Sequence, residues 1–192
     1  HSRIDDRVQA VVAQLKAGNL YINRNQIGAV VGSQPFGGEG LSGTGPKAGG
    51  PHYVQRFCAE DEVVSTAAEP AALISADEAQ KAIDAAPVCA QKGLSTHDMP
   101  GPTGESNRLS VYPRGRILCL GPGKEDKARQ QHDVAATRCV PVVLDGQITP
   151  ADFALLEGFE GAVYWGAMTQ KRAMRQALAR RDGALLPLIT EE

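Results

Sequence analysis

The sequence has no long apolar run, no excess charge of one sign and little cysteine. No apolar stretch approaches the roughly 20 residues that a helix needs to cross a bilayer, so we expect no membrane-spanning segment. The 20 basic and 22 acidic residues give a net charge of -2, which supplies no basic surface for nucleic acid. We therefore expect a soluble, cytoplasmic protein that does not bind nucleic acid through this segment.

Cysteine is sparse and irregularly spaced. Cys58, Cys89, Cys119 and Cys139 form no CxxC pair and have no close histidine, so neither a metal site nor a disulfide framework is indicated. We expect each thiol to be a small buried apolar side chain, most plainly at Cys119 inside the apolar run 116–120. The prediction for metal ligands is none.

An initiator methionine is also absent, because the sequence begins at His1 and enters a helical pattern at once. We interpret it as part of a longer polypeptide. Apolar residues at helical spacing predict a helix over residues 4–17, which Gly18 would end. The aromatic and β-branched run NLYINRN then predicts a strand over residues 19–25.

Glycine is concentrated in one segment, since nine of the 21 glycines lie between Gly28 and Gly50. A flexible linker is one interpretation of such a segment. An ordered glycine loop is the other, and we favour it because apolar residues are interleaved with the glycines, where a solvated spacer gains nothing from them. These residues are Ile27, Val30, Val31, Phe36 and Leu41.

The segment AGNLYINRNQIGAVVGSQPFGGEGLSGTGPKAGGP resembles the end of an aldehyde dehydrogenase catalytic domain, whose general signature is PFGG followed by SGTG. The flanking phrases NRNQIGAVVG and GEGLSGTGPKAGGP are similar to the dehydrogenase module of the proline utilization A family. The resemblance covers roughly residues 1–57. It implies membership of an enzyme that oxidises proline to glutamate, with FAD for the first oxidation and NAD for that of glutamate γ-semialdehyde.

The resemblance also implies roles for three residues. Main-chain amides of Gly28 and Ala29 match the family's aldehyde-anchor loop, which holds the α-carboxylate of the substrate. Phe36 would lie against the aliphatic part of the substrate, or would be an ordinary core aromatic residue. The family's cysteine nucleophile, glutamate base and NAD domain all lie upstream of the match. No catalytic residue and no bound cofactor are therefore expected here, and the chain alone is expected to be inactive.

The domain organisation predicted from these patterns has three parts. Residues 1–58 form the end of the aldehyde dehydrogenase catalytic domain, and residues 59–107 form a connector with one short helix near 77–86. The turn-rich stretch 100–104 closes the connector. Residues 108–192 form an incomplete Rossmann-like domain.

Residues 108–192 alternate between strand and helix patterns, which places the chain in the α/β class with a parallel sheet. We predict helices over 124–136 and 169–181, and another that begins with Thr149 as its cap and Pro150 in its first turn. The expected buried residues of the sheet are Val111, Ile117, Leu118, Leu120, Val140, Val142, Val143, Val163, Leu185 and Leu188.

The turn in LGPGKEDK could cradle a phosphate at a helix N-terminus. We favour the opposite interpretation, because GxGxxG spacing is absent, Pro122 removes a backbone donor and the bulky Trp165 would crowd a cofactor. The segment resembles the C-terminal domain of longer family members, which is not catalytic and helps to seal an internal tunnel. Glu191 matches the position of the family's general base and would be a relic or a surface carboxylate.

Two alternatives to this interpretation remain. The chain could be a non-enzymatic assembly or nucleotide-binding module, or it could belong to an aldehyde dehydrogenase that acts on another substrate. Under the favoured interpretation its partners are the rest of the parent polypeptide, the semialdehyde and other copies of the enzyme in a homo-oligomer.

Overall fold

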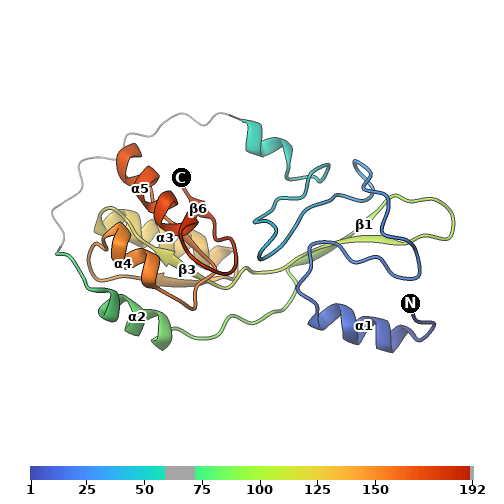
Figure 1. Ribbon diagram of the computed structural model, residues 1–192, viewed down its shortest axis with the longest axis horizontal. Helices are drawn as coiled ribbons and strands as arrows, with labels where there is room; N and C mark the ends of the chain where they lie inside the picture. The colour runs from blue at the N-terminus through green and yellow to red at the C-terminus, as the bar shows by residue number, and fades with distance from the viewer. Residues whose placement is uncertain (59–71, 191–192) are drawn as a thin grey trace. The chain divides into compact units, whose positions relative to one another are not determined.

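The computed structural model describes residues 1–58 and 72–190, so Glu191 lies outside the described residues. The fold is mixed α/β and contains a parallel sheet, as the sequence predicts. The chain forms two compact units (Figure 1). The described part of the first unit comprises residues 1–58, 96–109 and 183–185, and that of the second comprises residues 72–95, 110–182 and 186–190.

The first unit begins with helix α1 (Asp5–Gln14), which is shorter than the predicted helix over 4–17. Two acidic residues in its first turn complement the partial positive charge of a helix N-terminus. The helix ends where Leu15 adopts an extended conformation, before Gly18 is reached. No residue of α1 is buried, so its apolar side chains do not belong to a buried core in the described structure.

The predicted strand over residues 19–25 is wrong, because the structure has bends and extended chain there. Asn23 has a positive φ of 57°, which interrupts an extended run. A strand also needs a hydrogen-bonded neighbour, and no ladder pairs with this run within residues 1–58 and 72–190. Further on, the glycine loop is held by single antiparallel bridges, Val30 to Gln34 and Phe36 to Ala48, and a short 3-10 helix, η1 (Val54–Phe57), follows it.

Strands β1 (Ser95–Met99) and β2 (Asn107–Val111) form a two-stranded ribbon. The turn-rich stretch 100–104 lies between them, and Gly104 takes a φ of +89° there. Helix α2 (Ala76–Ala85) agrees closely with the helix predicted near 77–86 and begins with a capping box made by Ser75 and Glu78. The stretch predicted as a connector thus supplies a helix and a strand.

The second unit is a parallel four-stranded sheet flanked by helices, as far as the described residues show (Figure 1). Its strand order is β4-β3-β5-β6, so β4 lies on one side of β3, and β5 and β6 are added on the other side. The elements after α2 and the ribbon are β3 (Arg116–Cys119), α3 (Lys124–Ala136), β4 (Val140–Val143), α4 (Pro150–Leu155), β5 (Gly161–Val163), α5 (Met168–Ala179) and β6 (Leu188–Ile189). The predicted helix over 124–136 is confirmed, as are the Thr149 cap and Pro150 in the first turn of α4.

Each face of the sheet has its own buried cluster, because successive side chains of a strand point to opposite faces. Leu118, Val142 and Ala162 face α2, α4 and α5, whose buried members include Phe153. The opposite cluster, which α3 covers, contains Ile117, Cys119, Val134, Val163 and Trp165. Both clusters belong to the second unit.

The structure corrects two predictions about this core. Val143 is 38% exposed because β4 is an edge strand and Val143 follows the inward-facing Val142. Leu185 is 51% exposed because it precedes β6 in a loop. Ile117, Leu118, Leu120, Val142 and Val163 are buried as predicted, whereas Val111, Val140 and Leu188 are half-buried.

Among the described residues, no helix is both long and apolar enough to span a membrane.

Candidate substrate-anchoring site

The backbone at Gly28 and Ala29 presents two adjacent N–H groups. Gly28 has a φ of +128°, a conformation that side chains of L-residues rarely adopt. Within residues 1–58 and 72–190, no acceptor contacts either N–H group. Gly28 is half-buried and Ala29 is exposed. The pair can therefore donate hydrogen bonds to an anion without first breaking others.

Phe36 lies a short distance along the same loop. Its N–H and C=O are both paired with Ala48, at 3.0 and 2.8 Å, which fixes the backbone of the PFGG motif. Its ring is 53% exposed, so Phe36 is not a core residue of the described structure. An exposed aromatic ring on the same loop can accept the apolar part of a small molecule.

Two polar side chains that sequence patterns did not single out hold the PFGG motif in place. Asn19 donates from Nδ2 to the carbonyl of Pro35 at 2.9 Å and accepts from the N–H of Gly37 at 3.1 Å. The Lys47 ammonium donates to the carbonyls of Gly18 and Gly37 and to Asn19 Oδ1. Burial lowers the pKa of Lys47, and the nearby Glu39 partly offsets this effect.

Gly18 explains why this arrangement needs glycine. A Cβ added there would lie 1.8 Å from the carbonyl oxygen of Gly37, which is far inside van der Waals contact. The residue predicted to stop a helix is therefore needed for the close approach of two backbone segments. The spacing of residues along the chain did not predict that approach.

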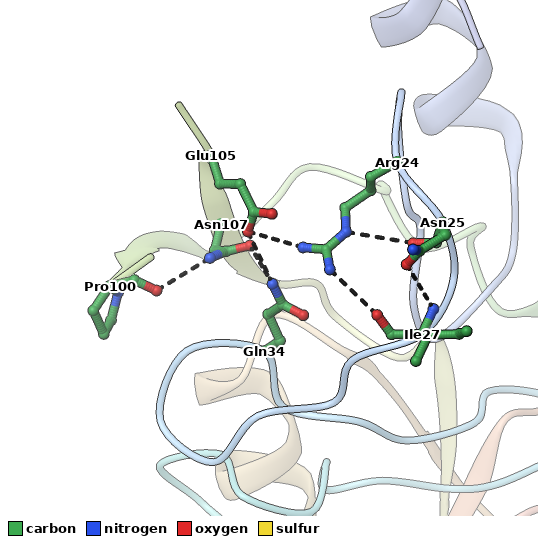
Figure 2. Close-up of polar contacts among 7 residues, drawn as sticks. All are labelled: Arg24, Asn25, Ile27, Gln34, Pro100, Glu105 and Asn107. Carbon is green, nitrogen blue, oxygen red and sulfur yellow. Dashed lines mark hydrogen bonds and ion pairs between the residues drawn. The ribbon is translucent and has the colours of Figure 1, made fainter. Parts of the chain in front are cut away.

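A polar network joins residues that precede and follow Gly28 in the sequence to Glu105 and Asn107 (Figure 2). Arg24 forms an ion pair with Glu105 at 2.9 Å, and its guanidinium also donates to the carbonyl of Ile27 at 3.3 Å. Gln34 Nε2 donates to Glu105 Oε2 and to Asn107 Oδ1. Sequence reasoning missed this network, because Glu105 and Asn107 are more than 70 residues from the loop.

In the second unit, the turn between β3 and α3 has no N–H group to spare on either side of Pro122. The N–H of Gly121 donates to Gln130 Oε1 at 2.9 Å, and that of Gly123 donates to Asp126 Oδ2 at 3.1 Å. A pyrophosphate would need such donors. The N–H groups of Gly121 and Gly123 are therefore already paired within the protein, and Pro122 between them has no N–H group to donate.

The prediction for Trp165 needs a correction, because its indole packs into the cluster under α3 and is 3% exposed. The indole of Trp165 is part of the core, and the neighbouring cavity is lined by Tyr164 and not by Trp165. Burial raises the pKa of the Tyr164 hydroxyl, and the charge of Asp126 adds to this shift. The cavity measures about 220 Å³ and is lined by Leu120, Gly146, Gln147, Ile148, Tyr164, Gln170 and Met174.

Of the four thiols, Cys89 and Cys119 are buried as predicted, whereas Cys139 is only half-buried. Cys58 is exposed, so the prediction that it is buried is wrong. Burial raises the pKa of Cys119 to about 12, which makes its thiol inert at neutral pH. Within the described residues, no cluster of three or more His, Cys, Asp or Glu side chains could hold a metal ion.

Comparison with known proteins extends these observations. Residues 1–63 match the model of the aldehyde dehydrogenase family. The bifunctional protein PutA of Klebsiella aerogenes is 34% identical over 97% of this chain, and that of Rhizobium meliloti is 36% identical over the same share. The chain spans 17 and 18% of the lengths of these two relatives.

A second kind of relative matches a shorter part of the chain. The human mitochondrial delta-1-pyrroline-5-carboxylate dehydrogenase is 45% identical over 67 residues, which are 34% of this chain and 12% of that protein. Together these relationships place the chain in an oxidoreductase family. It is a PutA-like region of the aldehyde dehydrogenase family.

Proposed function

We propose that the chain is part of a bifunctional enzyme of proline catabolism that oxidises L-proline to L-glutamate. The names of its relatives, bifunctional protein PutA and pyrroline-5-carboxylate dehydrogenase, support this role. In the intact enzyme FAD would serve proline oxidation, and NAD would accept a hydride during oxidation of glutamate γ-semialdehyde. The rest of the parent polypeptide would then be the chain's main partner.

One observation carries the substrate class: the N–H groups of Gly28 and Ala29 are adjacent and have no acceptor in the described structure. Successive backbone N–H groups form strong hydrogen bonds with a carboxylate. Glutamate γ-semialdehyde carries a carboxylate at the end opposite its aldehyde. Residues 1–58 would hold that end, while Phe36 contacts the methylene groups between the two ends.

The described residues of the first unit bind and orient the substrate in this proposal. Aldehyde oxidation also requires a nucleophile and a base near the carbonyl carbon. Cys58 is exposed and follows the glycine loop, so we assign it no role. We place the nucleophile, the base and the NAD site in other parts of the parent enzyme.

We further propose that residues 108–192 form a non-catalytic domain that covers a tunnel between the two active sites. The occupied N–H groups at the β3–α3 turn support this part of the proposal, because they argue against a second dinucleotide site. A covering domain needs a stable apolar core, and the two clusters of the second unit provide one.

The substrate assignment is tested with the full-length enzyme by following NADH formation. We expect kcat/KM for glutamate γ-semialdehyde to exceed that for butanal, which has no carboxylate, by about a hundredfold or more. Glutarate should compete with the semialdehyde, because it carries the same carboxylate. Equal kcat/KM values for the two aldehydes, or no inhibition by glutarate, would reject the proposal.

The covering role is tested by deleting residues 108–192 from the full-length enzyme and starting the reaction with proline. An intermediate that escapes to solvent must accumulate before the second reaction reaches its steady rate. The deletion should therefore introduce a lag in NADH formation and leave flavin reduction by proline largely intact. NADH formation without a lag would exclude the covering role.

A further inference from the structure

We propose that Arg24, Gln34 and Glu105 are positioning residues that hold the Gly28 and Ala29 amides in the orientation needed to bind the substrate carboxylate. The proposal rests on the proposed function of that loop. It adds Glu105, which lies in the turn between β1 and β2, to the determinants of substrate specificity.

Arg24 holds the loop immediately before Gly28 (Figure 2). Its guanidinium donates from Nε to the carbonyl of Asn25 at 3.4 Å and from Nη2 to the carbonyl of Ile27 at 3.3 Å. The Asn25 side chain in turn accepts from the N–H of Ile27 at 3.2 Å. The carbonyls of Asn25 and Ile27 are thus fixed by one rigid, planar group.

Glu105 fixes the guanidinium itself. Its Oε2 lies 2.9 Å from Arg24 Nη1, and the two side chains are only 28 and 32% exposed. The same oxygen accepts from Gln34 Nε2 at 3.3 Å. Because Glu105 pairs with Arg24, the guanidinium is not free to draw the substrate carboxylate away from the loop amides.

Gln34 closes the other side of the loop. Its backbone exchanges two hydrogen bonds with Val30, at 3.1 and 2.8 Å, so the residues after Ala29 are fixed as well. Its Nε2 also lies 3.4 Å from Asn107 Oδ1, and Asn107 donates to the carbonyl of Pro100 at 3.1 Å. The network therefore ties both ends of the anchor loop to one turn.

The space around Gly28 shows how closely the network contacts the loop. A Cβ at Gly28 would lie 3.2 Å from Arg24 Nη2 and 3.5 Å from Gln34 Oε1. That Oε1 atom is buried and has no donor in the described residues. Arg24 and Gln34 thus cover the α-carbon of Gly28 while its N–H stays without an acceptor, which is the arrangement that a preorganised donor requires.

The ribbon offers a matched control for this network. Asp98 of β1 and Arg108 of β2 form another ion pair, at 3.6 Å, with side chains 87 and 62% exposed. Neither residue has a hydrogen bond to the anchor loop in the described structure. Removing either ion pair leaves the net charge unchanged, so a difference between the two double variants reports on the loop.

The experiment compares Arg24→Ala/Glu105→Ala with Asp98→Ala/Arg108→Ala in the full-length enzyme. We expect the first variant to raise KM for glutamate γ-semialdehyde about tenfold, with kcat changed less than about twofold and kcat/KM for butanal unchanged. We expect the control to match the wild type with both aldehydes. A KM within about twofold of the control, or an equal loss with both aldehydes, would overturn the proposal.

Gln34→Met keeps the volume of the side chain and the backbone bridge, and it gives a second test if the double variant unfolds at a lower temperature. We expect about a threefold rise in KM for the semialdehyde alone. No rise would overturn the proposal. A wild-type enzyme without preference for the semialdehyde over butanal would instead reject the proposed function, so the two failures are distinguishable.

Discussion

At the scale of single residues, Gly28 combines an unusual backbone conformation with a crowded α-carbon and an N–H without an acceptor in the described structure. The sequence resemblance predicted its role as an anchor, and nothing yet tests that role. The conformation and the crowding could not be predicted, because they depend on Arg24 and Gln34 folding back over the loop.

Gly28→Val in the full-length enzyme should raise KM for glutamate γ-semialdehyde by about tenfold or more, because a β-branched residue disfavours positive φ and would push against Arg24. The rate with butanal should change much less. Gly32→Val is the matched control, since Gly32 also has a positive φ of 78° but no atom within 4 Å of an added Cβ. Similar KM values for the two variants would mean that backbone strain alone explains the effect.

Thiol reactivity also belongs to the scale of residues. Cys58 is exposed, whereas Cys119 is fully buried and has a pKa of about 12. At pH 8 only about one in ten thousand Cys119 thiols would be ionised, even if reagent reached them. Iodoacetamide should therefore modify Cys58 first and Cys119 only after unfolding, as measured by peptide mass spectrometry over time. Early modification of Cys119 would show that the buried cluster covered by α3 opens readily.

At the scale of elements, helix α3 uses two polar residues of its inward face to fix the turns around it. Gln130 bonds to both backbone groups of Gly121, and the Lys127 ammonium donates to the carbonyls of Leu144 and Gly146 at 2.7 and 2.6 Å. Burial lowers the pKa of Lys127, although Asp145 opposes this shift. The lysine thus helps to hold the loop after β4.

Lys127→Met should lower the free energy of unfolding by about 1–3 kcal/mol, because two buried carbonyls lose their donor. The difference from the wild type should grow as pH rises toward 10.5, the ordinary lysine pKa. In that range the unfolded chain binds more protons at Lys127 than the folded chain, so the wild type gains stability with pH. Urea unfolding followed by Trp165 fluorescence measures this, and a difference that shrinks with pH would contradict it.

The elements also show where sequence patterns succeed. Helix α3 was predicted with its observed bounds, and the two acidic residues in its first turn, Glu125 and Asp126, favour a helix start there. The strand predicted over residues 19–25 failed because pairing depends on a neighbour that local propensity does not reveal. The strands β1 and β2 were not predicted as a ribbon, since none of their residues is buried and β1 has polar residues in its centre.

At the scale of the whole molecule, the two units differ in how much apolar surface they bury. Both buried clusters belong to the second unit, and α1 buries no residue at all. Large apolar side chains of the first unit are exposed, including Val31 at 84% and Leu41 at 77%. A unit of this kind gains little stability from its own core.

Hydrogen exchange should therefore differ between the units of the 192-residue chain. We expect the amides of β3 and β5 to be protected for at least about a thousandfold longer than those of α1, because core strands open only with global unfolding. Mass spectrometry of exchanged peptides measures this ratio. Equal protection of α1 would show that the first unit is stable without further partners.

The side chain of Gln130 has one more consequence for the turn at Gly121. Its amide meets the N–H and the C=O of Gly121 at 2.9 and 2.8 Å, as another peptide group would. Chemically it is a ligand already bound and covalently tethered, with an effective local concentration in the millimolar range or above. A free phosphate would have to displace this tethered competitor, and the displaced amide would lose two buried hydrogen bonds. The Gln130 side chain of α3 therefore competes with any anion for the N–H group of Gly121.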